Sequence, residues 1–266
     1  MTLHVYRRAQ FIEVEPPYQD ILCAAGIGAS EVFTHPAIIP WRTLPDRDNC
    51  TLDLRRPSGA PVRLHVKRYR TSRPWHHPAR DEVRGLLLLR GAGVPAAELA
   101  AWGELADGRS FIMIADLAGY RAGDKLVSAG LPFESILIPT ARVAAALHNA
   151  GLHHRDLYLC HFFVAADPPG SDIRLIDAAR VRPLPPWPFR RRWIVKDLAQ
   201  FCYSLTQLGI ADDAQRRWLE CYSRLRDTPL SAGAIKAIRR KVLSIARHDR
   251  RLRSRQPLRN ISIPEA

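Results

Sequence analysis

Cysteine is scarce in this chain of 266 residues, and the cysteines that occur follow no disulfide or metal-binding pattern. The five are scattered singly, at Cys23, Cys50, Cys160, Cys202 and Cys221, without a CxxC pair. An odd number of separated thiols argues against a disulfide framework and against a zinc site. We therefore expect reduced thiols in a cytosolic environment.

Long apolar runs are absent as well. A helix that spans a membrane needs about 20 consecutive apolar residues, and no stretch approaches this length. The first residues also lack an apolar segment that could act as a signal peptide. The sequence predicts a cytoplasmic protein that is soluble or at most attached to a membrane surface.

Acidic residues and lysine are both in short supply. The chain has 26 acidic residues against 40 Lys and Arg, a formal net charge of +14, and only five of the basic residues are lysine. A field of this sign favours anionic partners such as nucleic acid, a phospholipid surface or a phosphorylated saccharide. Arginine binds phosphate and carboxylate through paired hydrogen bonds, although genome composition can also favour Arg over Lys.

The hydrophobic periodicity changes from strand to helix along the chain. Strands are expected over residues 38–44, 51–56, 62–69, 94–102 and 110–116. Helices are expected over residues 78–91, 132–150, 195–208, 212–225 and 232–250. A strand-rich first third followed by a helical remainder indicates an α+β protein.

The stretch Gly151–Phe163 between a helical pattern and a short apolar run reads GLHHRDLYLCHFF. Asp156 and His161 lie five residues apart in it. This is the layout of the catalytic loop in kinase-like phosphotransferases, where an Asp accepts the acceptor's proton and a residue five positions on binds the metal. Protein kinases carry Asn at the second position. We expect His161 to contact magnesium or phosphate, or to hold the loop through hydrogen bonds.

Phosphoryl transfer also needs a cation on the nucleotide phosphates, a partner that orients this cation, and a carboxylate for magnesium. Lys67 on the third predicted strand is the candidate cation, and Glu82, fifteen residues on, is its candidate partner. Asp177 follows Asp156 by 21 residues at the end of an apolar strand, where it is suited to bind Mg²⁺. Each residue also has a structural alternative. Lys67 could be a solvated lysine at a strand edge, and Glu82 could simply interact with the dipole of its helix. Asp177 could be a turn or cap aspartate.

Three further residues have expected supporting roles. His154 fixes the loop by packing or hydrogen bonding, and Arg155 pairs with a neighbouring carboxylate. Asp197, on the helix that follows, either hydrogen-bonds the backbone of the loop or caps the N-terminus of its own helix.

The run His-His-Arg-Asp-Leu-Tyr-Leu-Cys-His-Phe resembles the loop of the lipopolysaccharide core kinases, the Kdo/WaaP-type family, which reads HRD-x-x-x-CH-F. The motifs Leu-Ile-Asp, Lys-Asp-Leu-Ala and Tyr-Ser extend the resemblance over residues 35–210. It implies a bilobal protein-kinase-like fold. The N-lobe, residues 1–118, would be an antiparallel sheet with one main helix, and residues 119–266 would form a helical C-lobe.

The same resemblance implies ATP and Mg²⁺ as cofactors, with the backbone of Asp116 and Ala118 contacting adenine. It also implies an acceptor hydroxyl on a heptose or Kdo of the lipopolysaccharide inner core. His161 then favours this family over the protein kinases. A glycine-free turn over residues 45–49 leaves open how the nucleotide is covered.

The segment after the predicted metal strand also favours a saccharide acceptor. It reads Asp177-Ala178-Ala179 in place of Asp-Phe-Gly, which argues against a switch driven by Phe. Asp197 follows Asp177 by twenty residues, and four of those between are proline. So short and stiff a connector offers no platform for an extended peptide.

The last predicted helix begins a basic run over residues 236–259, with apolar residues at helical spacing. It is either a helix docked on the core with a solvated basic face, or a surface that docks on the anionic inner leaflet.

We therefore predict an ATP-dependent kinase that acts on a lipopolysaccharide core glycolipid. The alternatives are a small atypical protein kinase or small-molecule phosphotransferase, and a non-catalytic pseudokinase scaffold or nucleic-acid binder. The presence of Lys67, Glu82, Asp156 and Asp177 together argues against a pseudokinase. Nucleic acid is disfavoured because no basic motif is interleaved with aromatic residues.

Overall fold

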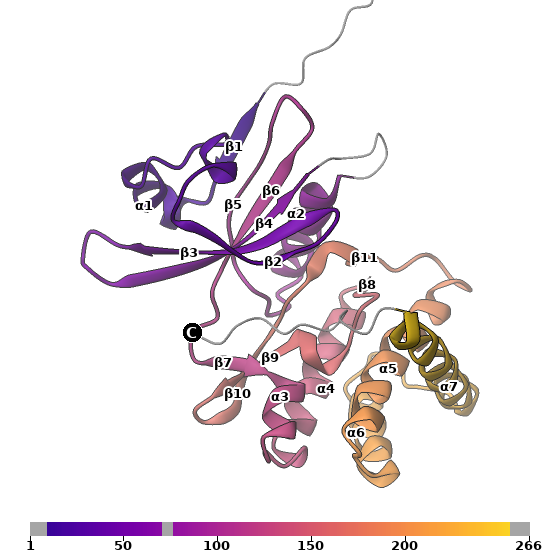
Figure 1. Ribbon diagram of the computed structural model, residues 1–266. Helices are drawn as coiled ribbons and strands as arrows, with labels where there is room; N and C mark the ends of the chain where they lie inside the picture. The colour runs from indigo at the N-terminus through magenta and orange to yellow at the C-terminus, as the bar shows by residue number, and fades with distance from the viewer. Residues whose placement is uncertain (1–9, 71–76, 256–266) are drawn as a thin grey trace, which may run out of the picture. The chain divides into compact units, whose positions relative to one another are not determined.

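The computed structural model describes residues 10–70 and 77–255, which divide into two compact units. The first unit comprises the described residues up to Leu86 together with Ala97–Asp116. The second comprises Leu87–Ala96 and the described residues from Leu117 onward. Figure 1 labels the helices and strands of each unit.

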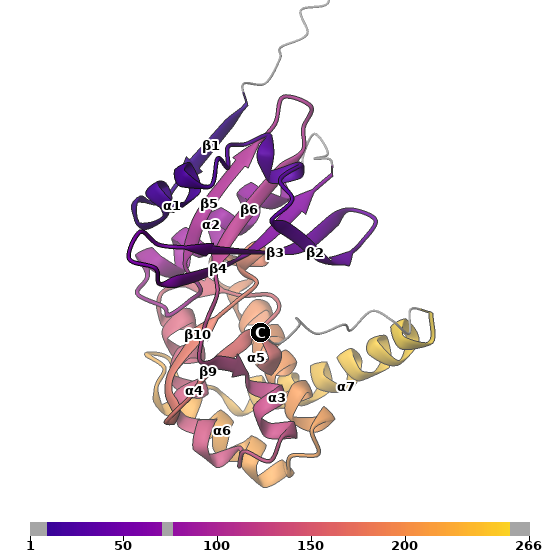
Figure 2. The same cartoon turned by 60° about the vertical axis from the view of Figure 1, so that its left-hand side comes forward.

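A six-stranded antiparallel sheet forms the first unit, in the order β1-β5-β6-β4-β3-β2. Its strands are β1 (Phe11–Val14), β2 (Ile38–Thr43), β3 (Arg47–Arg55), β4 (Pro61–Tyr69), β5 (Leu99–Glu104) and β6 (Ser110–Ala115). Its helical segments are η1 (Pro16–Tyr18), α1 (Gln19–Ala24), η2 (Glu31–Phe33) and the first part of α2 (Pro78–Gly91). Both views show α1 lying beside β1 (Figures 1 and 2).

The alternation of side chains along β4 gives this sheet two different faces. Leu64 and Val66 are buried in an apolar core that they share with Leu22 of α1. The side chains of Lys67 and Tyr69, at alternate positions after Val66, point to the opposite face, where both contact Glu82 of α2. One strand therefore serves the core and a polar cluster at once.

Two expectations for the first unit need correction, and one strand was not predicted. The strand expected from residue 51 begins at Arg47, because Arg47 to Asn49 pair with the end of β4, and the turn is correspondingly shorter than 45–49. The strand expected from Val94 begins at Leu99. The Pro95 carbonyl accepts a hydrogen bond from the Leu175 N–H instead, so that residues 94–96 pair within the second unit. The four-residue β1 was not expected at all, since so short a run carries no clear period.

Helices dominate the second unit, as expected, but short strands hold its loops. The helices are α3 (Gly123–Ser128), α4 (Glu134–Asn149), α5 (Arg190–Gln207), α6 (Asp212–Arg224) and α7 (Ala232–Arg255). The strands are β7 (Tyr120–Ala122), β8 (Leu152–His153), β9 (Phe162–Ala166), β10 (Pro169–Leu175) and β11 (Arg182–Pro183). They form a sheet in the order β10-β9-β7 and a β11-β8 pair. Helix α5 begins five residues before its expected start at residue 195, in a run of arginines that hides the period.

The core of the second unit centres on aromatic side chains of α5 and α6. The Phe201 and Trp218 rings stack with their centroids 4.0 Å apart, and the Tyr222 ring stacks on Trp218 at 5.9 Å. All three side chains are fully buried. Helix α4 packs on α6, and α7 packs on α5. Over residues 10–70 and 77–255, no helix is long and apolar enough to cross a membrane.

The aromatic core makes a direct stability prediction. Trp218 is fully buried, and its indole N–H donates to the Thr140 hydroxyl at 3.0 Å. We expect Trp218→Ala to lower the free energy of unfolding by about 3–5 kcal/mol through the cavity that it leaves, as measured by urea denaturation followed by circular dichroism. Trp187→Ala is the control, because Trp187 is 81% exposed. Equal unfolding midpoints for the two variants would contradict the packing described.

Candidate active site

Helix α4 leads the chain into the loop that carries Asp156. The helix ends at Asn149, and Gly151 takes a φ of +71°, a left-handed conformation that glycine adopts at little cost. Strand β8 follows, and the loop then runs through η3 (Leu159–His161) into β9. Arg155 also has a positive φ, +70°, which costs energy in a residue other than glycine. The surroundings must therefore hold the loop in place.

The carboxylate of Asp197 on α5 holds the loop backbone. Its two oxygens accept hydrogen bonds from the His154 and Arg155 N–H groups at 2.7 and 2.8 Å. His148 Nε2 lies 3.4 Å from the same carboxylate, which is fully buried. Burial by itself raises the pKa of Asp197, but His148 and the hydrogen bonds outweigh this effect and lower it. Asp197 lies well inside α5, so the alternative of a helix cap is wrong.

Two further residues on the same face of α5 continue this anchor. Gln200 and Ser204 follow Asp197 by three and seven positions, a spacing that puts all three side chains on one side of a helix. Gln200 accepts from the N–H of Leu157, and Ser204 accepts from the N–H of Leu159 at 3.1 Å. The sequence analysis missed both residues, although the polar spacing along α5 could have pointed to them.

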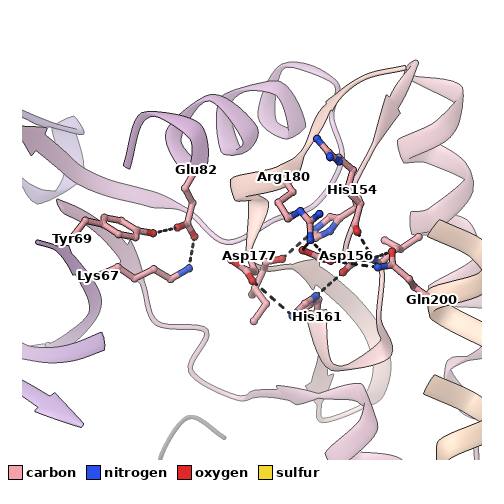
Figure 3. Close-up of polar contacts among 12 residues, drawn as sticks. Lys67, Tyr69, Glu82, His154, Asp156, His161, Asp177, Arg180 and Gln200 are labelled. Carbon is pink, nitrogen blue, oxygen red and sulfur yellow. Dashed lines mark hydrogen bonds and ion pairs between the residues drawn. The ribbon is translucent and has the colours of Figure 1, made fainter. Parts of the chain in front are cut away.

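Asp156 presents its carboxylate from this anchored loop. Both oxygens lie 3.0 Å from Nη1 of Arg180 on η4 (Ala178–Arg180), and Gln200 Nε2 lies 3.4 Å from one of them (Figure 3). The side chain keeps about a fifth of its surface exposed. A carboxylate held in this way is suited to orient a hydroxyl and accept its proton. Arg180 was not identified from the sequence.

Asp177 and His161 lie near each other beside this carboxylate-bearing loop. Asp177 follows β10 with a φ of +59°, and its Oδ2 is 3.9 Å from His161 Nε2 (Figure 3). His161 Nδ1 is 2.6 Å from the carbonyl oxygen of Asp156 and must donate to it. Burial by itself lowers the pKa of His161, but Cys160, Asp177 and the Asp156 carbonyl raise it to about 10.

Asp177 fits a magnesium ion that is held chiefly by a nucleotide. Over residues 10–70 and 77–255, no cluster of three or more His, Cys, Asp and Glu could hold a metal. Mg²⁺ commonly takes one or two protein ligands and completes its shell with phosphates and water. His161 could bind a metal through Nε2 only as a neutral ring, and its raised pKa favours the protonated ring at neutral pH. Its metal contact stays a prediction.

In the first unit, Lys67 and Glu82 form an ion pair with 2.6 Å between Nζ and Oε1 (Figure 3). Glu82 is fully buried, and its other oxygen accepts from the Tyr69 hydroxyl at 3.1 Å. The Lys67 side chain keeps about a fifth of its surface exposed. A buried carboxylate thus fixes an accessible ammonium group, which can bind a phosphate oxygen.

Asp116 ends the first unit and is held by two contacts. Its carboxylate lies 2.7 Å from His65 Nε2, and its N–H donates to the Arg63 carbonyl. These bonds use the side chain and the N–H and leave the Asp116 carbonyl as the group expected to contact adenine. Ala118 belongs to the second unit, and the contact of its backbone with adenine stays a prediction.

His154 and Arg155 differ in how they meet expectation. His154 is fully buried, and its Nε2 lies 3.2 Å from the Ile176 carbonyl, so it holds the loop as expected. The Arg155 guanidinium lies 4.6 Å from the Trp193 ring centroid. No ion pair joins it to a carboxylate of the described chain, so the predicted pairing is wrong. The Arg155 guanidinium makes a cation–π contact with the Trp193 ring instead of an ion pair.

Comparison with known proteins gives a consistent picture. The model of the lipopolysaccharide kinase (Kdo/WaaP) family matches residues 63–222. The lipopolysaccharide core heptose(I) kinase WaaP of Pseudomonas aeruginosa is 32% identical over 161 residues, 55% of this chain and 59% of that protein. WaaP of Escherichia coli is 30% identical over 91 residues, 33% of this chain and 34% of that protein. The matches therefore span less than two thirds of these relatives.

A solved structure shares the fold. The crystal structure of aminoglycoside-3'-phosphotransferase of type VIII matches 85% of this chain and 98% of its own, with a TM-score of 0.53 and 16% identity. At this identity the likeness is one of fold alone. It confirms the α+β, protein-kinase-like fold that the sequence predicted.

The buried anchor of the loop yields a test. Asp197→Asn keeps the size of the side chain but turns an amide donor toward one of two backbone N–H groups. We expect the free energy of unfolding to fall by about 3 kcal/mol, because buried partners lose their counter-charge. The measurement is urea denaturation at pH 7, with Asp213→Asn as the control, since the Asp213 side chain is 57% exposed.

The difference in stability between the wild type and Asp197→Asn should depend on pH. The pKa of Asp197 is lowered by folding, so its charge stabilises the fold above about pH 4, the ordinary aspartate value. This contribution is lost as the pH falls through the folded pKa. The difference between wild type and Asp197→Asn should therefore narrow in acid, and a constant difference would contradict the proposed ionised anchor.

Proposed function

The chain belongs to the lipopolysaccharide kinase (Kdo/WaaP) family, and on this premise we propose that it transfers the γ-phosphoryl group of ATP to a sugar hydroxyl of the lipopolysaccharide inner core. The acceptor sugar is a heptose or Kdo, and the names of the two WaaP relatives favour heptose. The observation that carries the proposal is the accessible Asp156 carboxylate on a backbone anchored by α5, inside the matched residues.

Asp156 is the group assigned to the acceptor. Its carboxylate orients the sugar hydroxyl and takes the proton as the oxygen attacks phosphorus. Gln200 and Arg180 hold the carboxylate from two sides. Arg180 also brings a positive charge to the site where negative charge on the transferred group is spread over its oxygens.

The residues assigned to the nucleotide are Lys67, Asp116 and Ala118. Lys67, oriented by Glu82, binds phosphate oxygens, as a compact ammonium charge on a strand does in this class of fold. The Asp116 carbonyl and the Ala118 N–H contact the adenine edge. The turn that covers the phosphates is the short β2–β3 connection, which has no glycine and so must use side chains.

The residues assigned to magnesium are Asp177 and His161. Mg²⁺ would neutralise charge on the nucleotide phosphates when bound. The Asp177 side chain is 42% exposed, and its Oδ2 lies 3.9 Å from His161 Nε2. His161 can therefore orient the Asp177 carboxylate. The left-handed backbone of Asp177 is maintained against its conformational cost, as is common for residues with a function.

The surface charge is compatible with an acidic, lipid-linked acceptor. Helix α7 buries Ala234 and Ile238 and exposes Lys236 and Arg239. The expected basic run continues to residue 259, and its last four residues lie outside the described part of the chain. We assign Lys236 and Arg239 to peripheral attachment at an anionic inner-leaflet surface.

The direct test incubates the pure protein with ATP, Mg²⁺ and inner-core glycolipid and follows the glycolipid by mass spectrometry. The expected result is one added phosphate per glycolipid. Phosphate on protein or on a small molecule, with none on any core glycolipid, would reject this function in favour of the alternatives.

Asp156→Ala tests the assigned base. We expect kcat to fall by about 10²–10⁴-fold, the usual contribution of a positioned general base, while ATP affinity stays unchanged. Transfer is followed by the same mass assay and ATP binding by calorimetry. Asp227→Ala removes an exposed carboxylate elsewhere in the second unit and serves as the control. Full phosphoryl transfer by Asp156→Ala would contradict the role of Asp156 as the base.

Glu82→Gln tests the nucleotide side separately. The change keeps an acceptor for the Tyr69 hydroxyl but removes the charge that holds Lys67. We expect the Kd for ATP to rise about tenfold, as measured by calorimetry. The matched control is Asp53→Asn, which also breaks an ion pair on this sheet, with Arg63. A similar loss of ATP affinity in the control would mean that Lys67 has no special part in binding.

A further inference from the structure

A groove of about 700 Å³ lies between α5 and α7 in the second unit. Its walls are formed by Pro188, Arg191, Arg192, Val195, Lys196, Ala237, Arg240, Lys241 and Ser244. Five of these nine residues are basic and none is acidic. The groove is thus large enough for a sugar-sized ligand and strongly positive on both sides.

The charges in the groove are not balanced by the protein. Arg191, Arg192 and Lys196 come from α5, and Arg240 and Lys241 come from α7. Within residues 10–70 and 77–255, none of the five lies within ion-pair distance of a carboxylate. Burial lowers the pKa of Lys196, and the charge of Arg180 lowers it further. Such a concentration of like charge in a concave surface attracts an anion.

The groove is connected to the catalytic loop. Lys196 Nζ donates to the carbonyl of Arg155, the residue before Asp156, at 2.7 Å. Lys196 and Arg192 also lie over the Trp193 ring, 5.7 and 5.5 Å from its centroid. One wall residue of the groove, Lys196, therefore also holds the backbone of the loop.

Exposed aromatic side chains stand next to the groove. Pro188 in its wall is flanked by Trp187, which is 81% exposed, and Phe189, which is 67% exposed. Exposed apolar patches rimmed by polar residues are a feature of ligand-binding grooves. The faces of Trp187 and Phe189 suit the apolar faces of a sugar ring, while the basic residues beside them suit its charged substituents.

We propose that this groove binds an anionic group, a phosphate or carboxylate carried by the saccharide acceptor, and so holds the acceptor beside the catalytic loop. The inference rests on the proposed function, because it assigns the acceptor side of the same site. It goes beyond it in naming the chemistry recognised, an acidic saccharide, and the helices that recognise it.

The test uses Arg240→Gln/Lys241→Gln, two changes on α7, a helix that carries none of the assigned catalytic groups. Lys236→Gln/Arg239→Gln is the matched control, with the same charge change on the same helix at exposed positions outside the groove. The probe is water-soluble, deacylated inner-core oligosaccharide that keeps its phosphates and carboxylates, titrated by calorimetry. We expect binding at least about tenfold weaker in the groove variant and within about twofold of wild type in the control.

Kinetics and vesicles separate the possible sources of the anion. With the same oligosaccharide as acceptor, the groove variant should raise the acceptor KM with little change in kcat or in ATP affinity. Unchanged oligosaccharide binding in the groove variant overturns the proposal. If the groove variant loses binding to phosphatidylglycerol vesicles but not to the oligosaccharide, the proposal is also overturned, because the groove would then bind a lipid surface.

The outcomes also distinguish this proposal from the function on which it rests. Oligosaccharide binding that depends on the groove, without transfer by the wild-type protein, would reject the kinase function and keep the groove. Transfer by the wild-type protein with an equal acceptor KM in the groove variant would reject the groove alone.

Discussion

The buried carboxylate of Asp197 is the interaction on which the second unit depends. An ionised carboxylate in the interior costs several kcal/mol unless charges and hydrogen bonds compensate it. Two backbone N–H groups of the loop and the imidazole of His148 compensate it here, and the Tyr222 hydroxyl binds His148 in turn. The Asp197 carboxylate therefore links residues of α4, α5 and α6. Moving the loop would remove the backbone hydrogen bonds that stabilise this buried charge.

This constraint explains why strained backbone persists nearby. Arg155 and Asp177 both have left-handed φ values that cost free energy in residues with a side chain. Hydrogen bonds to Asp197 fix the first, and the 3.9 Å approach of His161 accompanies the second. The Asp156 and Asp177 side chains remain 20% and 42% exposed, so a ligand can reach both carboxylates.

The sequence alone could predict the motifs because their chemistry is local. Spacing within the loop identified Asp156 and His161, and strand and helix periods identified Lys67 and Glu82 as partners, which the structure joins at 2.6 Å. The order of the longer strands of the first unit and of the main helices also followed from periodicity. In each of these motifs, one chemical role determines both the residue types and their spacing in the sequence.

What the sequence could not predict depends on distant pairing. Arg180 reaches Asp156 across 24 positions, and Gln200 reaches the loop from the next helix. Arg155 was expected on a carboxylate but lies on Trp193, because Asp197 is occupied by backbone donors rather than by a guanidinium. Short strands such as β8 and β11 exist only because they pair with each other, so no local period announces them.

Helix α5 thus has two tasks on two faces, and this division bears on how acceptor choice could change. One face carries Asp197, Gln200 and Ser204 against the loop, within the residues that the family model matches. The groove shares α5 as one wall, but its other wall is α7, which begins after the matched residues end at 222. Substitutions on α7 can alter the charge of the groove without touching the anchor of the loop. Under the proposed assignment, acceptor recognition is therefore free to change while the chemistry of phosphoryl transfer stays fixed.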